Sequence, residues 1–171
     1  FSVSKTRLSL GLDGFMTVEK RNIDDLDAKI ITILQSDGRI SNTEIGKLLG
    51  VSEATIRGRI KRLIDDEIIQ IVAVSNPLKL GFEITGDLYI SVDMTKMENV
   101  ISSISQFKEL WYIVATTGRS DLNAEFVVKN LEELHDLVYN RLSHIDGVQK
   151  VEIDVIMKYV KRRYDFGTPL A

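Results

Sequence analysis

The sequence contains no cysteine, only two prolines, and no long uninterrupted apolar run. The absence of cysteine excludes disulfides, thiolate metal sites and cysteine nucleophiles. An intracellular location is therefore expected. No segment is long and apolar enough to cross a bilayer, and the first 15 residues lack the apolar core of a signal peptide. We therefore expect a cytoplasmic protein with no membrane partner.

What is present is the composition of an ordinary folded protein. Of its 171 residues, 44% are hydrophobic and 27% are charged, which is enough apolar material for two small cores. Residues 1–21 show no sustained periodicity, and Met16 within them is a candidate native start. We expect residues 1–21 to be a poorly ordered extension.

The net charge of −3 hides an uneven distribution. Between residues 39 and 62 there are six basic and two acidic side chains, a net of +4. From residue 83 to the end there are fourteen acidic and ten basic side chains, a net of −4. A basic front half and an acidic back half indicate two modules with different partners.

The front module has the pattern of three consecutive helices. Residues 24–38 have a helical apolar period with acids in the first turn, where the helix dipole favours them. A second, short helix over 41–49 begins with a Ser41–Glu44 capping box, buries Ile45, Leu48 and Leu49, and stops at Gly50. Ser52 is the N-cap of a third helix. This order is typical of a helix-turn-helix, whose last helix reads DNA.

The third helix separates apolar from small and cationic residues. Its apolar face contains Ile56, Ile60, Leu63 and Ile64. An exposed glycine inside a helix costs about 1 kcal/mol relative to alanine, so Gly58 needs a compensating role. Close backbone approach to a major groove, with cations on both sides, provides one, although a merely solvated surface is the alternative. The candidate DNA-binding residues are Ser52, Ala54, Thr55, Arg57, Gly58, Arg59, Lys61 and Arg62.

Within this set we expect two kinds of contact with double-stranded DNA. Thr55, Gly58 and Arg62 are predicted to lie nearest base edges, whereas Arg57, Arg59 and Lys61 are predicted to contact mainly phosphates. A symmetric dimer would place two such helices in successive major grooves of a pseudo-palindromic site.

The rest of the chain alternates strands and helices. An apolar β-branched run over 68–74 predicts a connecting strand, broken at Asn76–Pro77. Two strand–helix–strand units follow, with the last strand alternating from Val151 to Tyr159, and predict a ferredoxin-like βαββαβ sandwich, whose uncovered sheet face needs a second subunit. The fold class is therefore α+β, with a winged-helix-like helix-turn-helix domain over 22–69, a connecting segment over 70–84, and the ferredoxin-like domain over 85–171.

This organisation resembles the Lrp/AsnC, or feast/famine, family of transcriptional regulators. The stretch DDLDAKIITILQSDGRISNTEIGKLLGVSEATIRGRIKRLIDDEIIQ is similar to the DNA-binding half of the family, and TTGRSDLN resembles its "TG-x-x-D" turn. The resemblance implies a DNA-binding dimer that assembles further, for example into an octamer, and binds a free amino acid between dimers. It also implies that residues 85–171 form the effector-binding and oligomerisation domain.

The same turn has chemistry that suits an amino acid. Gly118 allows close backbone approach, Asp121 can pair with an ammonium group, and Arg119 can pair with a carboxylate. With the resemblance, these three residues are the candidate effector-binding site. A simple hairpin turn is the alternative from the residues alone.

Catalysis finds little support in the sequence. His135 and His144 have no nucleophile or acid at useful spacing, and no metal site or cofactor is expected. The alternative function is an amino-acid-sensing regulatory subunit that acts on an enzyme, and an enzyme built on the same sandwich is a weaker one.

Overall fold

The computed structural model describes residues 23–169, and the expected extension over 1–21 lies outside them. The described chain forms two compact units. The first comprises residues up to 73 together with 161–169, and the second comprises Val74–Val160. The C-terminal segment therefore joins the first unit, whereas the sequence analysis grouped it with the effector domain.

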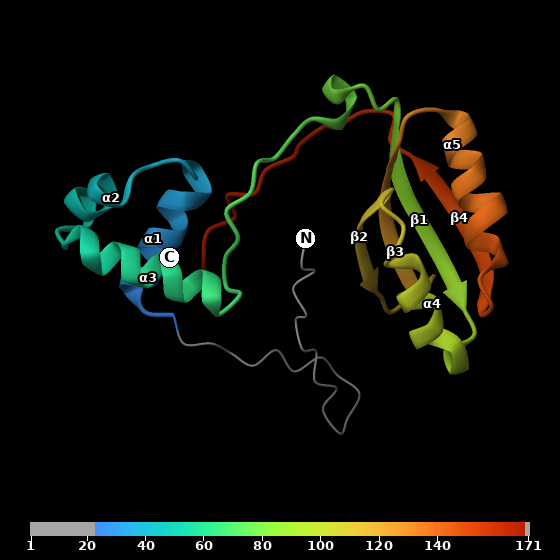
Figure 1. Cartoon of the computed structure of the whole chain (residues 1–171), viewed down its shortest axis with the longest axis horizontal. Helices are drawn as coiled ribbons and strands as arrows, with labels where there is room; N and C mark the ends of the chain where they lie inside the picture. Colours follow the sequence, from blue (N-terminus) through green and yellow to red (C-terminus); the bar gives the residue numbers. More distant parts are fainter. Residues whose placement is uncertain (1–22, 170–171) are drawn as a thin grey trace. The chain divides into compact units, whose positions relative to one another are not determined.

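The first unit is built from three helices (Figure 1). These are α1 (Asp25–Ser36), α2 (Asn42–Leu49) and α3 (Glu53–Asp65). Their apolar faces meet in one small core, in which Ile30, Ile45, Ile56 and Leu63 have no exposed surface. The predicted helix-turn-helix is confirmed.

Local capping explains where the helices begin and end. Ser41 and Glu44 form the predicted capping box at α2, and the Ser52 hydroxyl accepts the Thr55 N–H at the start of α3. Gly50 ends α2 with φ of 70°, a left-handed conformation that glycine adopts without steric penalty. These boundaries depend on neighbouring residues, so the sequence predicted them well.

Three details of the first unit were predicted wrongly. Leu48 and Ile64 were expected in the core, but they are 67% and 42% exposed. Residues 68–74, expected to form a connecting strand, contain neither helix nor strand, so the unit has no wing among the described residues. A strand needs a partner for its backbone hydrogen bonds, and β-branched composition alone cannot supply one.

The second unit contains a four-stranded sheet, with order β2-β3-β1-β4. The strands are β1 (Ile84–Val92), β2 (Leu110–Ala115), β3 (Leu122–Val128) and β4 (Val148–Val155). All neighbouring strands are antiparallel. The predicted ferredoxin-like sandwich is confirmed, but β4 stops at Val155, short of the expected end at Tyr159.

Helices cover one face of this sheet (Figure 1). Helix α4 (Met97–Ile104) links β1 to β2, and α5 (Leu131–His135) continues as a π-helical segment over Asp136–Arg141. Alternate residues of β1 and β3 point toward the helices and are buried. The core includes Leu88, Ile90, Val100, Ile104, Ala124, Phe126, Leu137 and Leu142.

Candidate nucleic-acid interface and effector turn

The outer face of α3 exposes small side chains and two long cations. Ala54, Thr55 and Gly58 are all exposed. The Arg57 and Lys61 side chains are 68% and 74% exposed. A face of this kind lets a duplex approach the helix backbone while cations reach phosphates on either side.

Among residues 23–169, no neighbour of Gly58 gives a packing reason for a glycine at this position. A Cβ atom built at Gly58 would meet no other atom within 4 Å. The site therefore has room for a larger side chain, and the helix propensity of glycine is unfavourable there. Because packing does not require a glycine at position 58, a partner outside the chain is the better explanation for it.

Within the part of the chain that the structure describes, the two exposed cations pair with carboxylates of their own helix. The Arg57 Nε donates to Glu53 Oε1 at 3.1 Å, and Lys61 pairs with Asp65, each one helical turn apart. These contacts raise the pKa of Arg57, first through its hydrogen bond to Glu53. Exposed pairs of this type contribute little to stability, so phosphates can displace the carboxylates.

Arg59 and Arg62 are in a different environment. Both guanidinium groups bond to Asp27 of α1, a carboxylate whose side chain is only 1% exposed. Arg59 also bonds to Asp24, which caps α1. The expectation that Arg62 reaches base edges and Arg59 reaches phosphates stays a prediction, and both side chains have internal partners that such contacts would have to replace.

The Asp24 carboxylate shows the strength of this arrangement. Its pKa is lowered to about 2, mainly because it accepts the Asp27 backbone N–H, with a further contribution from Arg59. The same network raises the pKa of Arg59 through its bonds to Asp24 and Asp27. Two arginines of α3 thus form ion pairs with acidic residues at the start of α1.

The sequence analysis missed Asp27, although a signal was present. Asp27 lies three, four and seven residues before Ile30, Ile31 and Leu34, on the apolar face of α1. A carboxylate on a core-facing stripe needs a partner, since an unpaired buried charge is unfavourable. Two arginines of α3 are that partner.

The candidate effector residues lie in the turn between β2 and β3. Gly118 has φ of 135°, which strains residues with a side chain, and a Cβ there would meet nothing within 4 Å. The turn is held by the Thr116 hydroxyl, which donates to the Ser120 carbonyl at 2.9 Å. Gly118 therefore combines turn geometry with open space beside it.

Asp121 and Arg119 already have contacts within the second unit. Asp121 Oδ2 accepts the Val92 backbone N–H at 2.9 Å, which ties the turn to the end of β1. The Arg119 guanidinium lies 3.6 Å from the centre of the Tyr89 ring, and its Nη2 is 3.5 Å from Asp154 Oδ2. Structural roles and effector contact are both compatible with this geometry.

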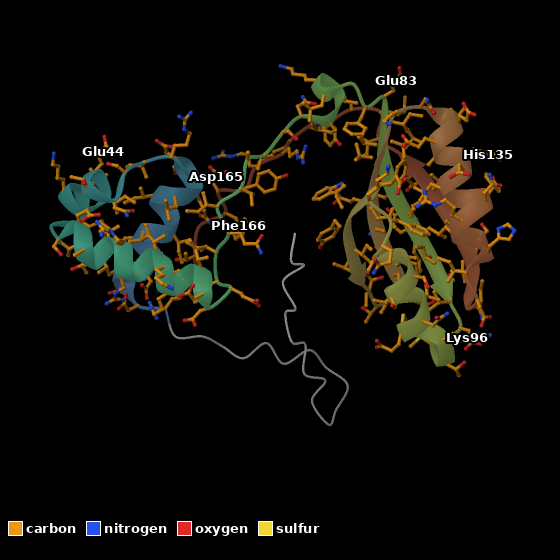
Figure 2. The ribbon with its side chains drawn as sticks, viewed as in Figure 1. Glu44, Glu83, Lys96, His135, Asp165 and Phe166 are labelled. Atoms are coloured by element: carbon orange, nitrogen blue, oxygen red, sulfur yellow. The ribbon has the colours of Figure 1, made fainter. Side chains whose placement is uncertain are left out.

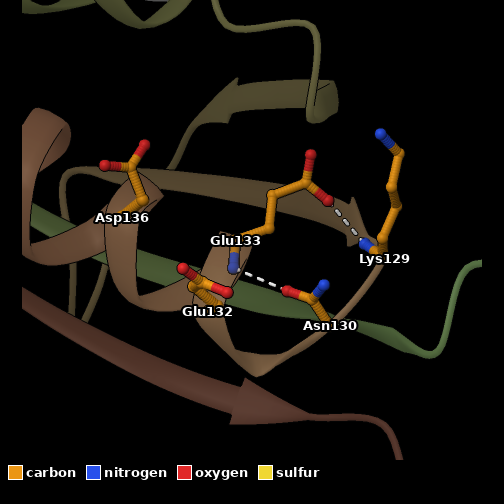
Figure 3. A pocket seen from close by; sticks show the side chains of 5 residues that line it. All are labelled: Lys129, Asn130, Glu132, Glu133 and Asp136. Carbon is orange, nitrogen blue, oxygen red and sulfur yellow. Dashed lines mark hydrogen bonds between the residues drawn. The ribbon is translucent and has the colours of Figure 1, made fainter.

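A separate pocket lies at the start of α5 (Figure 3). Asn130 Oδ1 accepts the Glu133 N–H at 2.9 Å, and Glu133 Oε2 accepts the Lys129 N–H at 2.6 Å. These bonds cap the start of α5. The pocket contains none of the predicted effector residues; it is lined by Lys129, Asn130, Glu132, Glu133 and Asp136.

The histidine of α5 lies apart from the turn. His135 projects from α5 away from the sheet (Figure 2), and its ring is 4.8 Å from that of Tyr139. This contact is an aromatic pair on the helix surface.

Comparison with known proteins identifies both units. Residues 23–64 match the AsnC-type helix-turn-helix domain, and residues 88–166 match the Lrp/AsnC ligand binding domain. The HTH-type transcriptional regulator FL11 of Pyrococcus furiosus is 36% identical over 140 residues, covering 81% of this chain and 92% of that protein. The chain belongs to the Lrp/AsnC family.

Another relative and two solved structures agree with this assignment. The HTH-type transcriptional regulator Ptr1 of Methanocaldococcus jannaschii is 31% identical, covering 81% of this chain and 95% of Ptr1. E. coli AsnC has the same fold, with a TM-score of 0.76, 22% identity, and coverage of 84% and 98% of the two chains. A Neisseria meningitidis regulator in complex with L-Met also has a TM-score of 0.76, with 24% identity and coverage of 87% and 97%.

This Lrp/AsnC protein is thus a transcriptional regulator with a DNA-binding unit and a ligand-binding unit. Within residues 23–169, no helix is long and apolar enough to cross a membrane.

Proposed function

We propose that a dimer of this regulator binds a pseudo-palindromic DNA site by inserting α3 of each copy into the major groove. Thr55 and Gly58 lie nearest base edges, with Ser52 and Ala54 beside them, and Arg57 and Lys61 contact phosphates. The observation that carries this proposal is the exposed surface of α3, where a glycine without internal constraint stands between two exposed cations.

We further propose that a free amino acid binds at the turn containing Gly118 and Asp121 and changes assembly and promoter binding. The support is the ligand-binding domain of the family and the open, left-handed geometry at Gly118. The solved regulator with L-Met shows that one protein of this fold binds an amino acid. Arg119 contributes to the effector carboxylate only after leaving Tyr89 and Asp154, so its role is secondary.

A salt series with Lys61→Ala tests the DNA-binding proposal. The measurement compares binding to the upstream region of the regulator's own gene with binding to a random duplex of equal length. Loss of one phosphate contact lowers affinity for both duplexes and reduces the magnitude of the log affinity–log salt slope by about 0.9.

Lys108→Ala is the matched control, because Lys108 is an exposed lysine of the second unit. It should leave the slope unchanged. Equal slopes for Lys61→Ala and the parent protein would reject the proposed contact. Failure of the parent protein to bind its upstream region while binding an enzyme would favour the alternative regulatory role.

A further inference from the structure

The DNA-facing helix carries four cations, but the structure divides them into two pairs. Arg57 and Lys61 are mostly exposed and bond to carboxylates of their own helix. Arg59 and Arg62 are 32% and 41% exposed and bond across the unit to α1. One acidic residue, Asp27, is shared by the second pair.

We infer that Asp27 determines DNA specificity by withholding Arg59 and Arg62 from phosphates and by fixing the position of α3. This inference rests on the proposed function of α3 as the DNA-reading helix. Asp27 is a positioning residue in this account, since it acts through α3 and the two arginines rather than by touching DNA.

The hydrogen bonds of Asp27 use both of its carboxylate oxygens. Oδ1 accepts from Arg59 Nη1 at 3.1 Å, while Oδ2 accepts from Arg62 and from the Asp24 backbone N–H, the latter at 3.1 Å. The Asp27 N–H in turn donates to Asp24 Oδ1 at 2.9 Å. One carboxylate therefore joins the capping box of α1 to two sites on α3.

This arrangement restrains α3 at two points. Arg59 and Arg62 are one turn apart, so their joint attachment to α1 limits both sliding and rotation of the helix. Positioning within the groove decides which side chains meet base edges, whereas phosphate contacts carry no sequence information. Fixing α3 thus favours discrimination between sequences.

Withholding two guanidinium groups has the same effect on specificity. Each additional phosphate contact strengthens binding to every duplex and steepens the salt dependence. If Arg59 and Arg62 turned to the backbone, affinity for random DNA would rise along with affinity for the operator. A buried carboxylate that holds them keeps the sequence-independent part of binding small.

Asp27→Asn tests the inference because asparagine preserves the size of the side chain and removes its charge. We expect random-duplex affinity to rise at least tenfold and the ratio of operator to random affinity to fall at least fivefold. The salt slope should steepen by up to about 1.8, the value for two released arginines that each gain a phosphate. Circular dichroism melts define the temperature range in which the variant is folded.

A purely structural role for Asp27 predicts a different result. The melting temperature would fall, but the slope and the affinity ratio of the folded variant would equal those of the parent protein. That outcome would overturn the inference. The triple change Asp27→Asn, Arg59→Gln, Arg62→Gln is the control, and it should return the slope to the parent value.

Arg59→Gln provides a second test that leaves Asp27 paired with Arg62. Because Arg59 contacts no phosphate in this account, the salt slope should remain within about 0.3 of the parent value, well below the 0.9 expected for a lost contact. A reduction in the slope of about 0.9 would show that Arg59 contacts DNA directly and would overturn the inference.

The two proposals fail in distinguishable ways. If Lys61→Ala has no effect on any duplex, the assignment of α3 as the reading helix is wrong. If Lys61→Ala reduces the slope, and either Asp27→Asn keeps the slope and affinity ratio of the parent protein or Arg59→Gln reduces the slope by about 0.9, only the inference about Asp27 is wrong.

Discussion

At the scale of single residues, Asp121 has a structural role and a proposed binding role, and replacement by alanine would remove both. Its Oδ2 accepts the Val92 N–H, and its charge suits the ammonium group of the proposed effector. Replacement by alanine removes both the acceptor and the charge. An unpaired buried N–H is unfavourable by about 1–3 kcal/mol, so alanine would weaken the fold as well as the site.

Asp121→Asn separates the two tasks, since its amide oxygen can still accept the Val92 N–H. We expect a melting temperature within about 3 °C of the parent protein, corresponding to less than about 1 kcal/mol. The stabilisation by the cognate amino acid should disappear because the ammonium partner has lost its charge. The measurement is a thermal-shift screen with each proteinogenic amino acid.

Glu132→Gln is the control for this screen, because Glu132 lies in the separate pocket at α5. It should preserve the shift. A full shift with Asp121→Asn would mean that the Asp121 charge does not contact the effector. Random-duplex and operator binding without the amino acid should be the same for all three proteins.

At the scale of elements, Gly58 lowers the stability of α3 but is proposed to strengthen its binding to DNA. Gly58 lowers helix stability, and the structure shows no neighbour that a Cβ would touch. The same open space is what a duplex would fill. Stability and DNA affinity should therefore respond to Gly58 in opposite directions.

Gly58→Ala should raise the free energy of unfolding by about 0.5–1 kcal/mol, because alanine favours the helix. Operator affinity should fall at least tenfold as the added methyl group separates helix from groove. Urea denaturation and operator binding measure the two effects on one preparation. Ser102→Ala, an exposed helical position in α4, is the control that should stabilise without changing DNA binding.

An increase in stability with unchanged operator affinity would show that Gly58 does not approach DNA. Loss of both stability and affinity would instead indicate that Gly58 has a structural role.

Elements also differ in how much of them was predictable. The start of α2 depends on Ser41 and Glu44, which are three residues apart, so the sequence predicted it correctly. The prediction of a strand over 68–74 was wrong, because a strand needs a hydrogen-bonding partner that nearby residues do not determine. The prediction that Leu48 is buried was wrong for a related reason. The apolar period of a helix shows which way a side chain points, but not whether another element covers it.

At the scale of the whole molecule, the sheet face opposite α4 and α5 is the proposed dimer surface. The strand registers align Tyr112, Glu125, Asp87 and Asp154 across this face. Tyr112 is 47% exposed, and the pKa of Asp87 is raised by burial and by neighbouring Asp154. An apolar residue bordered by acids suits a second subunit, and a further negative charge there would oppose it.

Tyr112→Glu should therefore shift the protein toward monomer in sedimentation velocity at micromolar concentration. Operator affinity should fall at least tenfold, because a monomer engages only one half-site. Tyr139→Glu is the matched control: Tyr139 is 59% exposed on the helical side of the unit, and its change should leave sedimentation unaltered. Identical sedimentation for both variants would exclude this face as the dimer surface.

The C-terminal segment also contacts α1 in a way that periodicity does not predict. Gly167 of the C-terminal segment exchanges two hydrogen bonds with the Gln35 side chain of α1, at 3.0 and 3.3 Å. The residues are 132 positions apart. The sequence analysis continued the alternation of the last strand to Tyr159, whereas β4 ends at Val155 and the Met157 side chain is 99% exposed.

The sequence by itself determined the three helices with their caps, the order of strands and helices, and the exposed small surface of α3. Each of these depends on residues within a few positions of one another, or on a periodicity visible along the chain. Only the tertiary structure decided that Arg59 and Arg62 face Asp27, and that Asp121 supports β1. Such pairings join residues about 30 positions apart, and a charged side chain has no local signal that distinguishes an internal partner from a phosphate.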